Sequence, residues 1–214
     1  MRPSHSHSHR HSQRSMKKLA TIISVVFHPL WIPLYALLLY RWQCPVELDP
    51  MPLEFGLVVI FTIFVPMLAL MLQMHRSQTH DIMLSNRRDR VWPYVITYVS
   101  YCLLCYSMVK IEAPFAVLTM SVYFLIAGGI VATINLIWKI SAHLCGVGGL
   151  LGMALFLLWR YQINLPSLLV VLVLLGGVVA WARLKLNAHT MAQVVAGWLV
   201  GVSVGVLFIF LFGN

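Results

Sequence analysis

Long uncharged and mainly apolar windows, separated by short polar connections, dominate the pattern of this sequence. Seven such windows follow one another, at residues 19–40, 55–74, 91–109, 113–138, 140–160 (ending on an arginine), 161–182 and 186–214. A helix needs about 20 mainly apolar residues to cross a bilayer. Since a bilayer satisfies no backbone groups, spanning segments must be helices or closed barrels. The pattern therefore predicts an all-α, polytopic integral membrane protein of about seven transmembrane helices.

The composition agrees with this reading and narrows it. The 214 residues include 15 basic and 6 acidic ones, 60% of the chain is apolar, and the mean hydropathy is +0.85. Charged residues make up about 25% of a typical soluble domain but only 10% of this chain. This scarcity excludes a soluble globular enzyme, a disordered chain and a nucleic-acid-binding domain, although the net charge is +9. We expect the lipid bilayer, and no nucleic acid, as a partner.

The first 17 residues have a different character from the rest. They are polar and basic and carry the alternating histidines His5, His7, His9 and His11. Segments with so little apolar content cannot fold around a core, and no small-residue cleavage site marks a signal peptide. We predict a disordered tail at 1–17 and a single transmembrane domain at 18–214. A histidine-rich tract can bind a divalent metal; incidental composition is the alternative.

Two features inside the windows concern packing. Pro29 and Pro33 predict a kink in the first span, because proline removes a backbone donor, and we interpret His28 as a hydrogen-bonded packing residue. The last window repeats G-x-x-x-G at Gly197, Gly201 and Gly205, with two further Gly-Gly pairs at 148–149 and 176–177. Small residues at this spacing let helices approach closely, so we read these glycines as packing positions.

Arginine and histidine side chains that could bind or react with a substrate are predicted to lie on one side of the membrane. Seven crossings place residues 1–18 and the connections at 75–92, 139–143 and 183–188 on the same side, with 12 of the 15 Lys and Arg residues. Arginine presents a planar fork of donors that suits phosphate oxygens, and histidine can serve as nucleophile or general acid. No paired-carboxylate, H-E-x-x-H or Walker pattern is present, so we expect neither a metal nor a cofactor. The side chains of this kind are Arg87, Arg88, Arg90, Ser141, His143, Arg183 and His189.

Over roughly residues 80–210, these side chains resemble the type 2 phosphatidic acid phosphatase (PAP2) superfamily, as a divergent bacterial branch. One signature of that family is Ser-Arg, five residues, His, three residues, Asp. Here it reads Ala182-Arg183, five residues, His189, three residues, Gln193. The spacing is kept, whereas the serine has become alanine and the acid has become glutamine.

The other two signatures are less complete. The family's Pro-Ser-Gly-His becomes Ile-Ser-Ala-His, which keeps Ser141 and His143 around Ala142. The signature with a lysine followed by Arg-Pro corresponds to residues 86–93, where the lysine is missing and arginine and proline are not adjacent. The order of the three motifs matches the family.

The resemblance implies a role for each matched residue. His189 would be the nucleophile that forms a phosphohistidine, and His143 the general acid for the leaving group. Gln193 stands where the family's acid orients the nucleophile; its oxygen can accept the same hydrogen bond but supplies no negative charge. The implied phosphate-binding set is Arg90, Arg183, Ser141 and the backbone N–H of Ala142, with Arg87 or Lys139 in place of the missing lysine.

The resemblance thus implies a metal-independent phosphatase in a bacterial inner membrane, acting on a lipid phosphate or diphosphate. Phosphatidic acid, phosphatidylglycerol phosphate and polyprenyl diphosphate are candidate substrates. One alternative is a catalytically impaired protein that binds or moves a lipid phosphate, as Gln193 favours; another is a small-solute transporter. The positive-inside rule places the site in the cytoplasm, whereas the resemblance implies the opposite face, and both orientations stay open.

Overall fold

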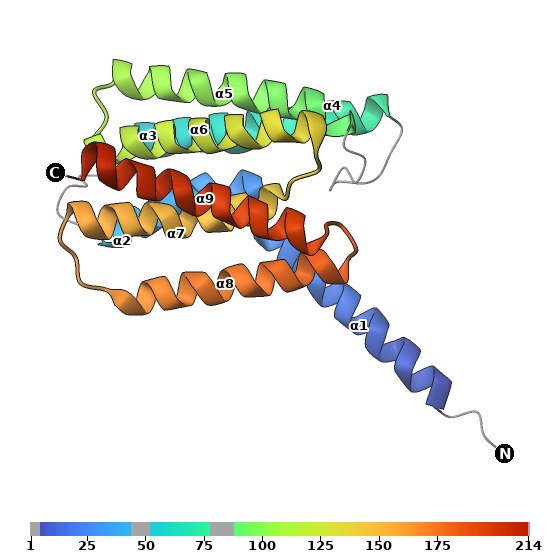
Figure 1. Cartoon of the computed structure of the whole chain (residues 1–214). Coiled ribbons are helices and arrows are strands. Elements are labelled where there is room, and N and C mark those ends of the chain that lie inside the picture. The colour runs from blue at the N-terminus through green and yellow to red at the C-terminus, as the bar shows by residue number, and fades with distance from the viewer. Residues whose placement is uncertain (1–4, 44–51, 78–87, 214) are drawn as a thin grey trace.

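The computed structural model describes residues 5–43, 52–77 and 88–213, and within these ranges every regular element is a helix (Figure 1). The elements are α1 (His5–Val26), η1 (Pro29–Trp31), α2 (Ile32–Gln43), α3 (Pro52–Val59), η3 (Ile60–Phe64), α4 (Val65–Arg76), η4 (Arg88–Arg90), α5 (Val91–Lys110), α6 (Phe115–Ile137), α7 (Ala142–Arg160), α8 (Pro166–Lys185) and α9 (Met191–Phe212).

Seven stretches of helix among the described residues are long and apolar enough to cross a membrane. The first combines α1, η1 and α2, the second combines α3, η3 and α4, and the other five are the longer helices α5 to α9. Large apolar side chains such as Ile137, Leu174 and Phe210 lie exposed on the outside of the bundle, as expected where lipid replaces water. The expected seven apolar helices of membrane-spanning length are thus present, and the part of the chain that the structure describes is an all-α bundle of the integral-membrane type.

The helix α1 begins at His5, so it includes residues 5–17, for which the composition predicted no structure. No proline or glycine occurs between His5 and Phe27. Adding residues to an existing helix is far easier than starting one, so a helix anchored by its apolar half extends into the polar segment. In Figure 1, α1 projects past the ends of its neighbours.

Prolines shape the first two spans, as predicted for the first. The helix breaks after Val26 and resumes at α2, with Pro29 at the start of the short η1 segment between them. In the second span, η3 is a π-helix that ends just before Pro66. The hydroxyl of Ser100 on α5 donates a hydrogen bond of 2.6 Å to the Phe61 carbonyl oxygen within η3. Neighbouring side chains thus satisfy backbone groups that proline leaves unpaired.

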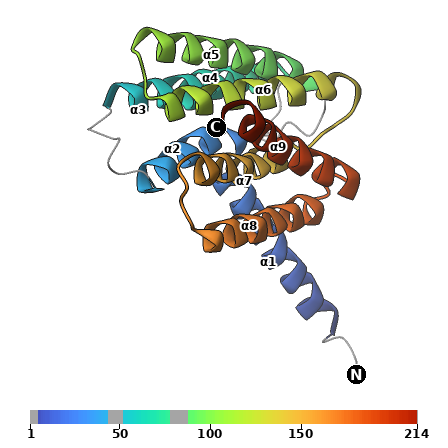
Figure 2. The same cartoon turned by 60° about the vertical axis from the view of Figure 1, so that its left-hand side comes forward.

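The closest helix pair in the bundle is α7 with α9, which cross in both views (Figures 1 and 2). Gly201 and Gly205 of α9 lie directly on the backbone of α7: a Cβ atom at either position would overlap Cys145 or Gly152 main-chain atoms. At Gly197 the same atom would overlap the Ser141 carbonyl oxygen. The interpretation of these three glycines as packing positions is confirmed, and the contact holds the first turns of α7 and α9 together.

The polar helix ends gather on one side of the bundle, at the right of Figure 1. The end of α4, the start of α5, the α6–α7 connection and the α8–α9 connection all lie there, and α1 leaves the bundle at the same side. This is the grouping that seven crossings predicted. The candidate residues therefore occupy one end of the molecule.

Candidate functional site

The first turns of α7 and α9 form the floor of the candidate site. Ser141 is the N-cap of α7: its hydroxyl oxygen accepts the Leu144 N–H at 3.4 Å. The Ser141 N–H donates to the carbonyl oxygen of Gln193 in α9 at 3.3 Å. The first N–H groups of a helix lack partners within the helix and favour anions. Two helix N-termini therefore present such groups side by side, with Ala142 at the start of one of them.

Gln193 orients the ring of His189. Its Oε1 atom lies 3.2 Å from His189 Nδ1 and accepts the backbone N–H of Thr190 at 3.1 Å. Because a backbone N–H only donates, this atom is the amide oxygen, and Nδ1 must carry the ring proton. The Nε2 atom of His189 then keeps its lone pair. Glutamine therefore fixes the tautomer that a nucleophilic histidine requires.

The same contacts explain locally why a glutamine stands at this position. Thr190 is the N-cap of α9, and its hydroxyl oxygen accepts the Gln193 N–H at 3.4 Å. With the reverse bond from the Thr190 N–H, this is a capping box, which uses Glu or Gln at its third helical position. A threonine followed by glutamine at this spacing is visible in the sequence and signals the cap, which we did not predict.

His189 is buried, with 7% of its surface exposed, and it is surrounded by cations. Burial lowers the pKa of His189 from its ordinary value of 6.5 to about 3. The positive charges of Arg90, Arg183 and Lys139 contribute to the lowering of this pKa, in that order, and the hydrogen bond to Gln193 opposes it. The imidazole is therefore neutral at neutral pH, which is the nucleophilic form.

The cations come from connections that lie far apart in the sequence. Arg90 ends η4 and is the N-cap of α5; it is buried and hydrogen-bonds the Tyr94 hydroxyl one turn later. Arg183 lies in the last turn of α8 and is only 1% exposed, and half-buried Lys139 precedes α7. Several cations beside a neutral histidine can bind an anion that has several oxygens.

His143 lies in the first turn of α7 and is buried against α1. Its Nε2 atom is 3.0 Å from the Ser24 carbonyl oxygen. A carbonyl oxygen only accepts, so Nε2 donates and Nδ1 is the nitrogen left for proton transfer. His143 also interacts electrostatically with Arg183 and His189.

A third histidine, His28, completes the cluster, although we interpreted it from the sequence as a packing residue. Its ring meets the ring of His143 edge to face, with 5.2 Å between the centroids. The His28 Nδ1 atom accepts the Leu30 N–H at 3.4 Å, so the proton sits on Nε2. Arg183 and Arg90 lie within electrostatic range of this ring. A histidine at a proline break inside an apolar window was the available signal, because such polar groups often mark functional sites.

A cavity of about 110 Å³ opens beside this cluster. Its wall includes His28, Arg90 and His143 together with apolar residues of η1, α4 and α5. His189 is not part of the wall. Arg90 links the two regions, since it lines the cavity and also acts electrostatically on His189.

The structure thus brings together most of the residues that the sequence singled out. These are His189, Gln193, Arg90, Arg183, Lys139, Ser141, Ala142 and His143. Arg87 lies outside the described residues.

Neither a protein-family model nor a curated protein or solved structure matches this chain. Its function is therefore inferred from the geometry of the site and from the chemistry of the residues that form it.

Proposed function

We propose that this protein is a membrane-embedded phosphatase with a PAP2-like core, which hydrolyses a lipid phosphate or diphosphate in a bacterial inner membrane through a phosphohistidine. One observation carries the proposal: His189 is neutral, oriented with Nε2 free of the proton, and set among Arg90, Arg183 and Lys139. A packing histidine needs no cations around it. A histidine that attacks phosphorus needs them to hold the phosphate oxygens.

The first chemical step transfers the phosphoryl group to the enzyme. His189 Nε2 attacks phosphorus while the bond from phosphorus to the lipid oxygen breaks. The leaving oxygen takes the electron pair of that bond and a proton from His143 Nδ1, which the negative charge of the bound phosphate would favour in its protonated form. Nδ1 of His189 keeps its proton throughout, and Gln193 holds it in place.

The second step releases inorganic phosphate. Water attacks the phosphorus of the phosphohistidine and gives a proton to His143 Nδ1, and the electron pair of the N–P bond returns to His189 Nε2. Both histidines then have their starting proton count. Throughout the cycle Arg90, Arg183 and the N–H groups at the start of α7 bind the non-bridging oxygens, where negative charge accumulates.

The phosphate also changes the electrostatics of the nucleophile. Burial and the surrounding cations lower the basicity of His189. A bound phosphate brings negative charge among the same cations and offsets their effect on the ring. Phosphate binding therefore makes the His189 ring more nucleophilic.

A second function, binding or moving a lipid phosphate without turnover, is favoured by one specific observation. The residue at position 193 is a glutamine, so no negative charge there stabilises the imidazolium character that develops on His189 as the N–P bond forms. In a serine protease, replacing the orienting Asp by Asn lowers kcat by about 10⁴-fold. Phosphate-release assays on the purified protein separate the two functions.

Replacing Gln193 with glutamate is expected to raise the rate of phosphate release by at least about tenfold. Glutamate has the length of glutamine, so it keeps both hydrogen bonds of 3.2 and 3.1 Å to His189 and Thr190 and adds the missing charge. A carboxylate beside the ring stabilises its protonated form and raises the pKa of His189 from about 3. The acid limb of the kcat/KM profile should therefore move to higher pH.

Two further variants calibrate this experiment. Gln193→Asp carries the charge on a side chain one carbon shorter and should gain less, because the capping-box geometry is lost. Gln193→Leu removes the acceptor and should lower the rate. The phosphatase proposal is contradicted if neither the wild type nor Gln193→Glu releases phosphate although Gln193→Glu binds lipid phosphate. The protein then binds or moves a lipid phosphate without turnover.

His28 should contribute a hydrogen bond to phosphate rather than a packing contact. Its Nε2–H, left available by the tautomer that Leu30 imposes, is positioned on the cavity wall to donate to a phosphate oxygen. We expect His28→Phe to lower kcat by about 10²-fold, the usual cost of losing one donor to the transition state. His28→Gln keeps an N–H at a similar reach and should stay within about tenfold of the wild type.

The two substitutions distinguish a hydrogen-bonding role of His28 from a packing role, because each keeps one of the two contacts and removes the other. Phenylalanine preserves the edge-to-face contact with His143 and glutamine removes it. A packing role is indicated if His28→Phe remains active while His28→Gln loses activity and thermal stability in detergent.

A further inference from the structure

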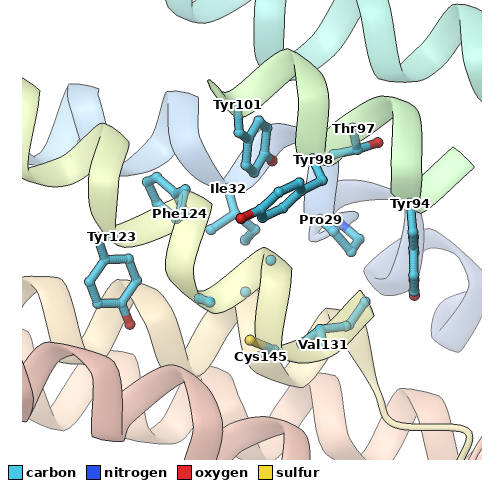
Figure 3. A pocket seen from close by; sticks show the side chains of 14 residues that line it. Pro29, Ile32, Tyr94, Thr97, Tyr98, Tyr101, Tyr123, Phe124, Val131 and Cys145 are labelled. Atoms are coloured by element: carbon cyan, nitrogen blue, oxygen red, sulfur yellow. The ribbon is translucent and has the colours of Figure 1, made fainter. Parts of the chain in front are cut away.

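A second, apolar cavity adjoins the polar one (Figure 3). It has a volume of about 100 Å³ and lies between α5, α6, α7 and the η1 segment. The two cavities share Pro29, Tyr94, Thr97, Tyr101 and Ala142 in their walls. They are therefore neighbouring compartments, one of them next to the cationic cluster and the other inside the apolar bundle.

A larger groove of about 680 Å³ runs between α5 and α6 on the outside of the bundle. Exposed apolar residues such as Val95, Val99 and Leu136 line it, so it faces lipid in a membrane. This groove shares Tyr94 and Tyr98 with the inner apolar cavity. Two tyrosine side chains thus stand between the bilayer and the interior.

Tyr98 is the more exposed of these two tyrosines. Its ring lies across the cavity in Figure 3, and the residue is 42% exposed. The ring rests on Gly129 of α6, where an added Cβ would lie only 2.9 Å from the Tyr98 Cε2 atom. A side chain that is exposed on one face can change rotamer rapidly, and a rotation of this ring away from the shared wall would join the groove to the cavity.

Tyr94 marks the polar end of the path. It lines all three spaces, and its hydroxyl is hydrogen-bonded to Arg90. Apolar residues such as Phe124, Val131 and Cys145 form much of the remaining wall of the inner cavity. A ligand that follows the path meets cations at one end and hydrocarbon at the other.

We propose that part of one hydrocarbon chain of a long-chain lipid phosphate enters the bundle between α5 and α6 and occupies the inner apolar cavity while the phosphate lies beside Arg90. This inference rests on the proposed function and extends it, because it places the chain inside the protein rather than in the surrounding bilayer. Charge complementarity orients the lipid: the phosphate belongs at the Arg90 end. Apolar cavities favour apolar occupants over water, so the rest of the cavity suits an alkyl or isoprenoid chain.

Gly128→Leu tests the proposal by filling the inner cavity. Gly128 lines this cavity, and an added Cβ would lie 3.6 Å from the Tyr101 Cε2 atom, which is an ordinary contact. The remaining leucine atoms then occupy the space meant for the chain. The matched control is Gly177→Leu, the same change at a glycine of α8 whose Cβ would meet nothing within 4 Å.

Two substrates are compared, dioleoyl phosphatidic acid in mixed micelles and the water-soluble p-nitrophenyl phosphate. We expect Gly128→Leu to raise KM for the long-chain lipid by about tenfold or more, the range expected for a blocked apolar pocket. The kcat/KM for p-nitrophenyl phosphate should stay within about twofold, and Gly177→Leu should change neither. An equal loss on both substrates, or an unchanged KM for the lipid, overturns the proposal.

A second readout does not depend on turnover. A phosphatidic acid analogue with a photoreactive diazirine on its chain should label the buried cavity residues Tyr101 or Phe124 of α5 and α6. Labelling should be lost in Gly128→Leu and retained in Gly177→Leu. If the wild type hydrolyses neither substrate but shows this labelling, the phosphatase proposal has failed and the chain site stands; labelling confined to the lipid-facing residues of all helices overturns the chain site.

Discussion

Replacement of His189 by alanine is expected to abolish phosphate release from a lipid phosphate. Loss of the nucleophile removes the covalent intermediate, and such losses reduce kcat by about 10⁴-fold or more in enzymes that depend on one. The remaining cations would still bind the substrate, so binding of dioleoyl phosphatidic acid should change little. The measurement is phosphate release by purified protein in detergent micelles, together with a binding isotherm for the same lipid.

The matched control is His75→Ala. His75 lies in the last turn of α4 at the same end of the bundle but is exposed, and it should keep wild-type activity. The thermal unfolding temperature of His189→Ala should stay close to that of the wild type, because the neutral His189 contributes one side-chain hydrogen bond, to Gln193. A loss of activity without a loss of stability then indicates a chemical role. Activity above a tenth of the wild-type rate in His189→Ala would show that another group attacks phosphorus.

The second large effect concerns the scaffold. Gly201→Leu is expected to prevent the native packing of α7 against α9, because even a Cβ there overlaps main-chain atoms of Cys145 and Gly149. Overpacking that only displaces side chains costs about 1–3 kcal/mol, and a clash with backbone leaves no side chain to yield. We expect the variant to lose its cooperative thermal transition and to elute as aggregate in size-exclusion chromatography.

Gly177→Leu again serves as the control and should remain folded, since its Cβ faces open space. Any folded fraction of Gly201→Leu should be inactive, because the same crossing sets the 3.3 Å bond from the Ser141 N–H to the Gln193 carbonyl oxygen. A Gly201→Leu protein with the stability and activity of the wild type would contradict the close α7–α9 contact.

Much of the fold follows from elementary features of the sequence. Uncharged windows of membrane-spanning length predicted the seven spans, because few charges interrupt them. Alternation of the spans then predicted that the connections near Arg90, Lys139 and Arg183 share one end. The glycine spacing in the last window predicted close packing, although it did not identify α7 as the partner of α9.

Other features depended on tertiary contacts that spacing does not encode. The composition of residues 5–17 did not indicate that α1 begins at His5, because these polar residues extend a helix that the apolar second half of α1 anchors in the bundle. His28 was interpreted as a packing residue because its closeness to His143 arises only when α1 ends against α7. The chain path past Tyr94 and Tyr98 is likewise a product of packing between α5 and α6. Ring orientation at His189 was predictable only as far as Gln193 can accept a hydrogen bond.

The proposed role of His189 as carrier of the phosphoryl group is tested most directly by trapping the intermediate. Wild-type protein is mixed with dioleoyl phosphatidic acid, quenched in alkali during turnover, digested and analysed by mass spectrometry. We predict one acid-labile phosphoryl group on the peptide that contains His189, formed at the rate of turnover and absent from His189→Ala. Continued phosphate release by the wild type with no phosphorylated His189, or with the label on another residue, would contradict this role.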